Sequence, residues 1–148
     1  MFGDKEALMD ALYDHALLWI RQYNDEHSQE GCNVFSSVGL AHMNIARKEP
    51  NLFDFVYLSP FCKAEDMDSL SRIAEQPGVI QKMAEAWGID NELAHDLYLD
   101  MAIYAHGLAS LVVTGAHIGN DEIRARMNTV FYALAEARGA QLERKTNF

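Results

Sequence analysis

The sequence predicts an all-α domain. Apolar residues recur at three- and four-residue steps along almost the whole chain, which is the period of helices that bury one face. Turn residues such as Pro50 and the Pro77–Gly78 pair fall between these periodic stretches, and no stretch alternates in the manner of a strand. With 148 residues, of which 49% are apolar, we expect one domain over residues 1–139 and a frayed tail at 140–148.

The first three predicted helices lie in the N-terminal half. The first spans Lys5–Tyr23, with Asp4 as its N-cap, and a polar loop follows at Asn24–Gly31. The second spans Val34–Lys48 and ends in two basic residues, which suit the carbonyl end of a helix. Proline favours the first turn of a helix, so a short apolar helix is predicted over Pro50–Leu58.

The remaining helices are delimited by capping residues. Asp66 caps a helix that Pro77–Gly78 interrupts, and a further helix continues to Trp87. The longest helix spans Asn91–Thr114, and the last spans Asp121–Arg138 between Asn120 and Gly139. The chain is therefore expected to contain about six helices.

Charge and cysteine content exclude several classes of function. Twenty-two acidic against twelve basic residues give a formal charge of −10, which opposes binding to phosphate backbones. Cys32 and Cys62 match no metal-ligand spacing and are expected to be reduced thiols in a cytoplasmic protein. The N-terminus has no apolar segment typical of a signal peptide.

The stretch Met101–Ala116 is apolar on every side. Residues 101–120 contain no Asp, Glu, Lys or Arg, so the helix here must be covered all round. It is shorter than the roughly 20 residues that span a bilayer, and no membrane segment is expected. Periodicity leaves two explanations open, which are the core of a monomer and burial against a second subunit.

Three segments, in the same order, resemble the C-terminal region of the tetracycline-repressor-like (TetR/AcrR) transcriptional regulators. Phe2–Leu8 (FGDKEAL) is similar to the junction that follows the DNA-reading helix of that family. Val38–Phe53 resembles a helix that leads into a Pro-x-Leu-Phe step. His106–Gly115 (HGLASLVVTG) resembles a helix of one C-terminal subfamily. The family's helix-turn-helix domain, which would precede Phe2, is not contained in these 148 residues.

The resemblance implies a domain that binds a small, partly apolar effector and forms a two-fold homodimer through a four-helix bundle. Bulky apolar residues and a few polar groups would line the effector cavity. The predicted ligand-binding residues are Met9, Tyr13, Phe35, His42, Met43, Trp87, Met101 and Tyr104. The predicted dimer contacts are Leu108, Leu111, Val112, Met127 and Phe131. DNA would be bound only through the helix-turn-helix domain outside this chain.

Other functions remain open from the sequence. The chain could act as a stand-alone interaction protein that forms mixed dimers with full-length regulators, or as a helical dimer without a ligand. A helical-bundle metal-binding enzyme is a further alternative, because Glu92 and His95 have the Glu-x-x-His spacing of di-iron bundles, although the partner motif of such a site is missing. No catalytic triad, phosphate loop or carboxylate pair is found, so we expect no enzyme, metal or cofactor. His42 and His106 could also be ordinary core histidines.

The acidity of the chain leads to a first prediction. In a fluorescence-anisotropy titration with duplex DNA at about physiological salt, we expect no sequence-dependent binding, because few basic groups are available to release counterions. Tight binding that distinguishes one duplex from another would contradict this interpretation.

Overall fold

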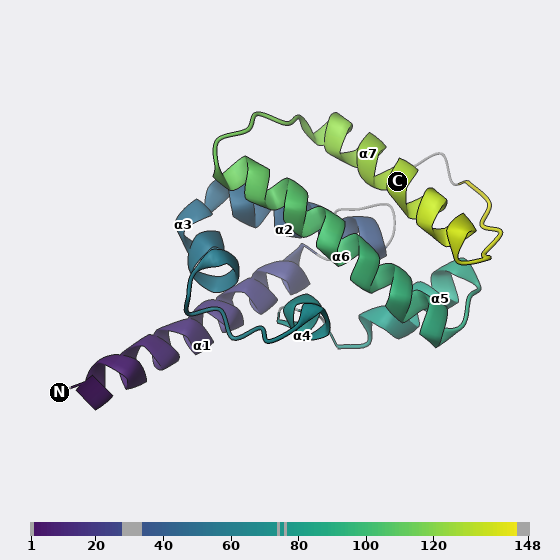
Figure 1. Ribbon diagram of the computed structural model, residues 1–148. Coiled ribbons are helices and arrows are strands. Elements are labelled where there is room, and N and C mark those ends of the chain that lie inside the picture. Colours follow the sequence, from purple (N-terminus) through teal and green to yellow (C-terminus); the bar gives the residue numbers. More distant parts are fainter. Residues whose placement is uncertain (1, 28–33, 74, 76, 145–148) are drawn as a thin grey trace.

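Every regular element in the described part of the chain is helical, in the computed structural model of residues 2–27, 34–73, 75 and 77–144 (Figure 1). The predicted all-α class is therefore confirmed for these ranges. The elements are α1 (Phe2–Glu26), α2 (Val34–Lys48), α3 (Pro50–Phe53), the π-helix η1 (Asp54–Leu58), α4 (Met67–Arg72), α5 (Val79–Trp87), α6 (Asn91–Val113) and α7 (Asn120–Ala137).

Most helix ends follow the capping residues. The Asp66 side chain accepts a hydrogen bond from the Ser69 amide at 2.7 Å, and the Ser69 hydroxyl binds the Asp66 amide in return. Asp90 caps α6 through the Leu93 amide at 2.8 Å. Gly88 ends α5 in the left-handed conformation, at φ 64°, which glycine adopts without strain.

Two predicted caps are wrong. Helix α1 already begins at Phe2, so Asp4 lies inside its first turn, where it still faces the positive end of the helix dipole. Asn120 is the first residue of α7 rather than its cap, and its side-chain oxygen accepts a hydrogen bond from Arg47. That bond ties the start of α7 to the end of α2.

The predicted helix over Pro50–Leu58 contains a change of winding. Its second half is the π-helix η1, which ends with the Ser59 amide donating to the Asp54 carbonyl at 2.8 Å. The Val56 carbonyl cannot receive the usual bond from residue 60, because Pro60 has no N–H. The Tyr13 hydroxyl donates to that carbonyl instead, at 3.1 Å, and so fixes η1 against α1.

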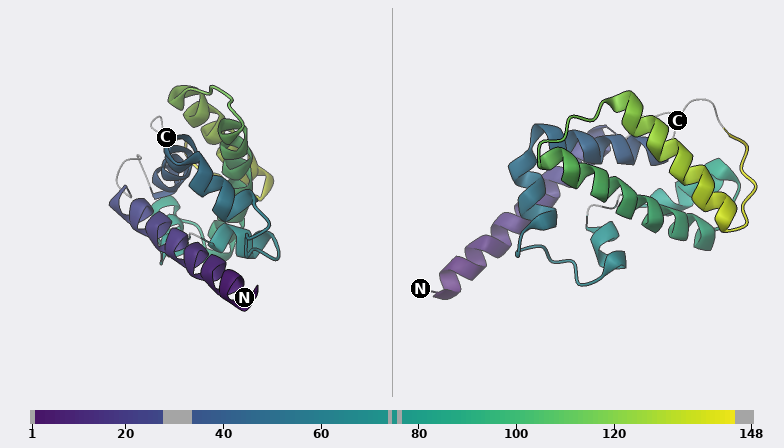
Figure 2. Two further views of the ribbon diagram at one scale, coloured as in Figure 1. Left: turned by 90° about the vertical axis from the view of Figure 1, so that its left-hand side faces the viewer. Right: turned by 45° about the horizontal axis from the view of Figure 1, so that its top comes forward.

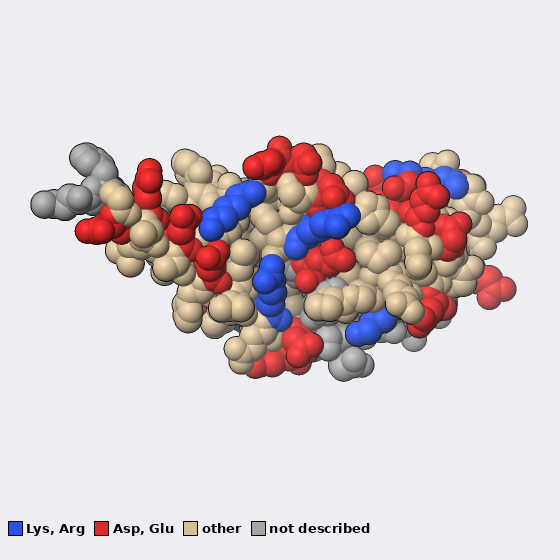
Figure 3. Space-filling view, turned by 90° about the horizontal axis from the view of Figure 1, so that it is seen from below, with Lys and Arg blue, Asp and Glu red and all other residues tan. Residues whose placement is uncertain are grey.

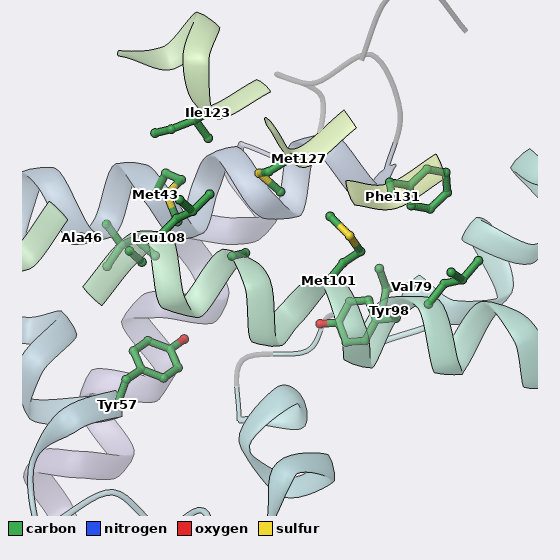
Figure 4. Close-up of a cluster of buried hydrophobic side chains, with 14 of the residues drawn as sticks. Met43, Ala46, Tyr57, Val79, Tyr98, Met101, Leu108, Ile123, Met127 and Phe131 are labelled. Atoms are coloured by element: carbon green, nitrogen blue, oxygen red, sulfur yellow. The ribbon is translucent and has the colours of Figure 1, made fainter. Parts of the chain in front are cut away.

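Helix α6 is the central element. It packs against α2, α4, α5 and α7, and Figure 1 shows these helices arranged around it. Figure 4 shows Met101 and Leu108 of α6 directed toward the side occupied by Met43 of α2 and Met127 of α7. All four side chains are buried in one apolar core. Gly39 admits Met127, because a Cβ at this position would lie 2.5 Å from the Met127 Cε.

Coverage of α6 is not complete within the chain. Ile103 and Leu111 are 41% and 53% exposed, although their segment was expected to be buried all round. Coverage by the chain's own helices therefore leaves one strip of α6 open to solvent.

Ion pairs and the C-terminal segment hold the helices together. Arg138 binds Asp96 and Asp100 of α6, each at 2.8 Å. Residues 140–144 belong to the segment predicted as a frayed tail. Here Ala140 and Leu142 pack against the core, and the Tyr132 hydroxyl donates to the carbonyl of residue 143 at 3.2 Å. Residues 145–148 lie outside the described residues.

None of the helices in the described ranges is long and apolar enough to cross a membrane.

The packing of α7 leads to a second prediction. Phe131 is fully buried and its ring centroid lies 4.9 Å from that of Trp87. Phe131→Ala should lower the free energy of unfolding by about 3–5 kcal/mol in urea denaturation, because it leaves a cavity in the core. Leu111→Ala, at an exposed position, serves as the control and should change the free energy of unfolding by less than about 0.5 kcal/mol. Equal effects of the two variants would contradict the described packing.

Candidate ligand-binding site

A cavity of about 70 Å³ lies beside the central helix. Helices α2 and α6 form its inner walls, η1 and α4 contribute from the opposite side, and Met127 reaches it from α7. At about 30 Å³ for each molecule of liquid water, this volume corresponds to about two water molecules. Met67 and Ile103, which are 49% and 41% exposed, mark the side at which the cavity meets solvent. The space therefore suits a small molecule or one end of a larger one.

His42 supplies a buried polar atom without a partner. It lines the cavity, and its Nε2 has no hydrogen-bond partner among the described residues. Aromatic rings surround it, since its ring centroid lies 4.9 Å from Phe53, 5.0 Å from Tyr57 and 5.9 Å from His106. An unpaired buried nitrogen costs stability, on the order of 1–3 kcal/mol, unless a further molecule binds it.

Both histidines of the cavity favour the neutral form. Burial lowers the pKa of His42 to about 3, and the neighbouring His106 lowers it in the same direction. Burial also lowers the pKa of His106. The imidazoles therefore act as neutral hydrogen-bonding groups at physiological pH, and not as cations that would attract an anion.

Two tyrosines add further polar groups. Tyr57 of η1 and Tyr98 of α6 line the same cavity, and Figure 4 shows their hydroxyl groups directed toward each other from opposite sides. Burial raises the pKa of both hydroxyls above its usual range, so both keep their protons. Within the described part of the chain, no Asp, Glu, Lys or Arg lines the cavity. Its chemistry is that of a neutral, mostly apolar site with a few hydrogen-bonding groups.

The structure brings together only part of the predicted ligand-binding set. His42 and Met101 line the cavity. Tyr13 and Met43 are buried elsewhere in the core, where Tyr13 holds η1. Trp87 packs on Phe131.

The remaining predicted ligand-binding residues are not among the described residues that line the cavity. Met9 is half-buried on α1, and Tyr104 packs at the edge of the core. The side chain of Phe35 lies outside the described residues.

The predicted dimer contacts are largely occupied inside the chain. Leu108, Met127 and Phe131 are at most 8% exposed, because α6 and α7 turn these side chains toward the core. Val112 is half-buried, and Leu111 alone among the five is mainly exposed. A four-helix bundle between two copies would therefore have little apolar surface from these residues with which to form. The three- and four-residue spacing showed that these residues share an apolar helix face. It could not show whether that face packs inside the chain or against a second copy.

His95 of the alternative metal motif is in hydrogen-bond contact with a carboxylate of another helix. His95 Nε2 lies 3.1 Å from a carboxylate oxygen of Asp68, which also binds Arg72 at 2.9 Å. This contact ties α4, one wall of the cavity, to α6. Within the described ranges no group of three or more His, Cys, Asp or Glu side chains could hold a metal ion. Cys62 is a free, half-buried cysteine, and Cys32 lies outside the described residues.

Sequence reasoning missed several lining residues. Tyr57, Tyr98 and Leu70 were absent from the predicted set, and His106 was weighed as a polar group but not chosen. The spacing of Tyr98, Ala102 and His106 at steps of four residues could have pointed to a shared face of α6. The contributions of η1 and α4 depend on how distant segments meet, which periodicity does not reveal.

Comparison with protein-family models, curated proteins and solved structures finds no match. The resemblance to the TetR/AcrR regulators therefore rests on the sequence segments alone.

The buried histidines lead to a third prediction. Their pKa values are lower in the folded than in the unfolded chain, so the unfolded chain binds more protons below about pH 6.5. The free energy of unfolding should fall as pH drops from about 6.5 toward 4, with a slope of up to about 1.4 kcal/mol per pH unit for His42.

His42→Phe should flatten this slope in urea denaturation at several pH values. The exposed His15→Gln is the matched control and should leave the slope as in the wild type. An unchanged slope in His42→Phe would show that the imidazole is not buried in its neutral form.

Proposed function

We propose that this chain is an effector-binding domain, in which a small, neutral and largely apolar molecule occupies the cavity between α2, α4, η1 and α6. The observation that carries the proposal is the Nε2 of His42, which is buried in a cavity wall without a hydrogen-bond partner among the described residues. A bound hydroxyl or carbonyl group would satisfy this atom, because a neutral imidazole nitrogen donates or accepts according to its tautomer.

The rest of the lining supports the same class of ligand. Met101, Met127 and Leu70 offer adaptable apolar contacts, and the tyrosine hydroxyls offer further hydrogen bonds. A charged ligand finds no opposite charge among the described residues of the lining, so its desolvation would not be offset.

The sequence resemblance suggests how such binding would be used. In a TetR-like regulator, the effector-binding domain controls a helix-turn-helix domain, and here that domain would lie outside these 148 residues. Figure 3 shows acidic side chains gathered along α1 and basic side chains scattered singly on the same face, which offers no continuous basic surface to DNA. Regulation would therefore act through another segment or another chain.

Calorimetry with a matched set of probes tests the proposal and is the fourth prediction. Benzyl alcohol should bind the wild-type chain more tightly than toluene, which lacks the hydrogen-bonding group, and benzoate should bind least. His42→Phe should raise the dissociation constant of benzyl alcohol roughly tenfold, which is the equivalent of one hydrogen bond of about 1.4 kcal/mol. The same variant should change the dissociation constant of toluene little.

His15→Phe is the control for a histidine on the surface and should bind all three probes like the wild type. The proposal fails if no neutral probe binds the wild-type chain, or if benzyl alcohol binds the wild type and His42→Phe equally well.

A further inference from the structure

Helix α4 differs from the other walls of the cavity, because none of its residues is buried. Met67, Leu70 and Ser71 of this helix line the cavity. Between Tyr57, which is 8% exposed, and Val79, which is 1% exposed, every described residue is half-buried or exposed. Helix α4 lies at the outer edge of the molecule, at the end of a segment that follows η1 (Figure 1 and Figure 2). An element with so few buried contacts belongs to the least stable part of a fold.

The other walls of the cavity are anchored in the core. Met101 of α6 and Met43 of α2 are fully buried, and α1 and α7 also bury several residues. The π-helix η1 buries Val56, whose carbonyl accepts a hydrogen bond from the Tyr13 hydroxyl at 3.1 Å. Opening the cavity at any of these walls would bring core side chains into water. A shift of α4 would expose only half-buried side chains such as Leu70.

The chain is fixed on both sides of α4. Before the helix, the Lys63 amide donates to the buried Tyr13 hydroxyl at 3.2 Å. After it, the buried residue Val79 begins α5. Helix α4 carries its own N-terminal cap, the reciprocal pair of Asp66 and Ser69. It can therefore move between these two fixed points as a unit, without losing the hydrogen bonds that end it.

Two hydrogen bonds fasten α4 to other helices in the described part of the chain. A carboxylate oxygen of Asp68 lies 3.1 Å from Nε2 of His95 on α6, and Arg72 of α4 holds the same carboxylate at 2.9 Å. At the other end, Arg21 of α1 donates to the carbonyl of Ile73 at 3.3 Å. Contacts that are exposed to solvent in this way contribute little stability, so they can break while the core stays folded.

We propose that α4 is the gate of the cavity, which lifts from α6 to admit a ligand and closes again through the contact between Asp68 and His95. This inference rests on the proposed function, because a gate serves only a cavity that takes up a ligand. Met67 of α4 and Ile103 of α6, which are 49% and 41% exposed, mark the seam along which the two helices separate. Asp68 and His95 are positioning residues and do not line the cavity.

Thiol labelling measures access to the cavity without any ligand. The probe is Met101→Cys, at a cavity-lining position with 0% exposure, in a chain in which Cys32→Ser and Cys62→Ser remove the native thiols. Met83→Cys is the matched control, because Met83 of α5 is 1% exposed and is not among the described lining residues. We expect the thiol at position 101 to react at least about tenfold faster, because the gate exposes it while position 83 is reached only by wider unfolding.

Variants of the contact between α4 and α6 test whether α4 is the element that opens. His95→Ala should speed labelling at position 101 by about twofold to fivefold, in the range of an exposed polar contact, and should leave position 83 unchanged. His15→Ala, at an exposed position of α1, is the control and should change neither rate. Equal rates at positions 101 and 83 would overturn the proposal. Faster labelling in Tyr13→Phe but not in His95→Ala would also overturn it, since the opening would then lie at η1.

Benzyl alcohol separates the gate from the proposed function. Where it occupies the cavity, it should slow labelling at position 101 in proportion to its occupancy and leave position 83 unchanged. Faster labelling at position 101 that benzyl alcohol does not slow would support the movement of α4 and contradict the proposed ligand. Circular dichroism of each variant shows whether the domain stays folded.

Discussion

The whole fold depends on the need to cover one apolar helix. The stretch of α6 from Met101 to Val113 has no charged residue, and a helix without a polar face is stable in water only where other elements exclude solvent from it. Helices α2, α5 and α7 provide most of that cover, and the short α4 closes one further side. The ion pairs of Arg138 with Asp96 and Asp100 lie at the wetter N-terminal half of α6, where charge is tolerated. This requirement explains why α2, α5 and α7 all pack on α6.

Three rings meet at one side of the cavity, and methionine and leucine side chains form much of the remaining lining. His42, Tyr57 and His106 meet at centroid distances of 5.0 to 5.9 Å, and rigid rings fill the space between helices less completely than leucines would. The fold therefore bears the cost of a buried unpaired nitrogen at a place where an aliphatic residue would stabilise the core more. A buried unpaired polar atom persists in proteins mainly where another molecule binds it.

The helices could be predicted from the sequence because their signals are local. Asp66, Asp90 and Gly88 each act on the few residues beside them, and the structure places them as predicted. The cavity could be predicted only in part, because Tyr57 and Tyr98 are distant in sequence and meet only when η1 folds against α6. The sequence also could not show in which direction an apolar helix face points. The pattern of Met127 and Phe131 shows an apolar face but not whether that face meets the same chain or a second one.

The same limitation concerns α1, whose two apolar faces are distinct only in the folded chain. Tyr13 on its inner face donates to the Val56 carbonyl, and the next residue, Tyr57, lines the cavity. Helix α1 is thus joined by one hydrogen bond to the wall that would contact a ligand. Such a link transmits ligand binding to α1 only if the ligand binds one arrangement of α1 and η1 better than another, and equal affinity for both would shift neither. Because Tyr13 is fully buried and bonded on both sides, to Val56 and to the Lys63 amide at 3.2 Å, any shift of η1 must move α1 with it or break these bonds.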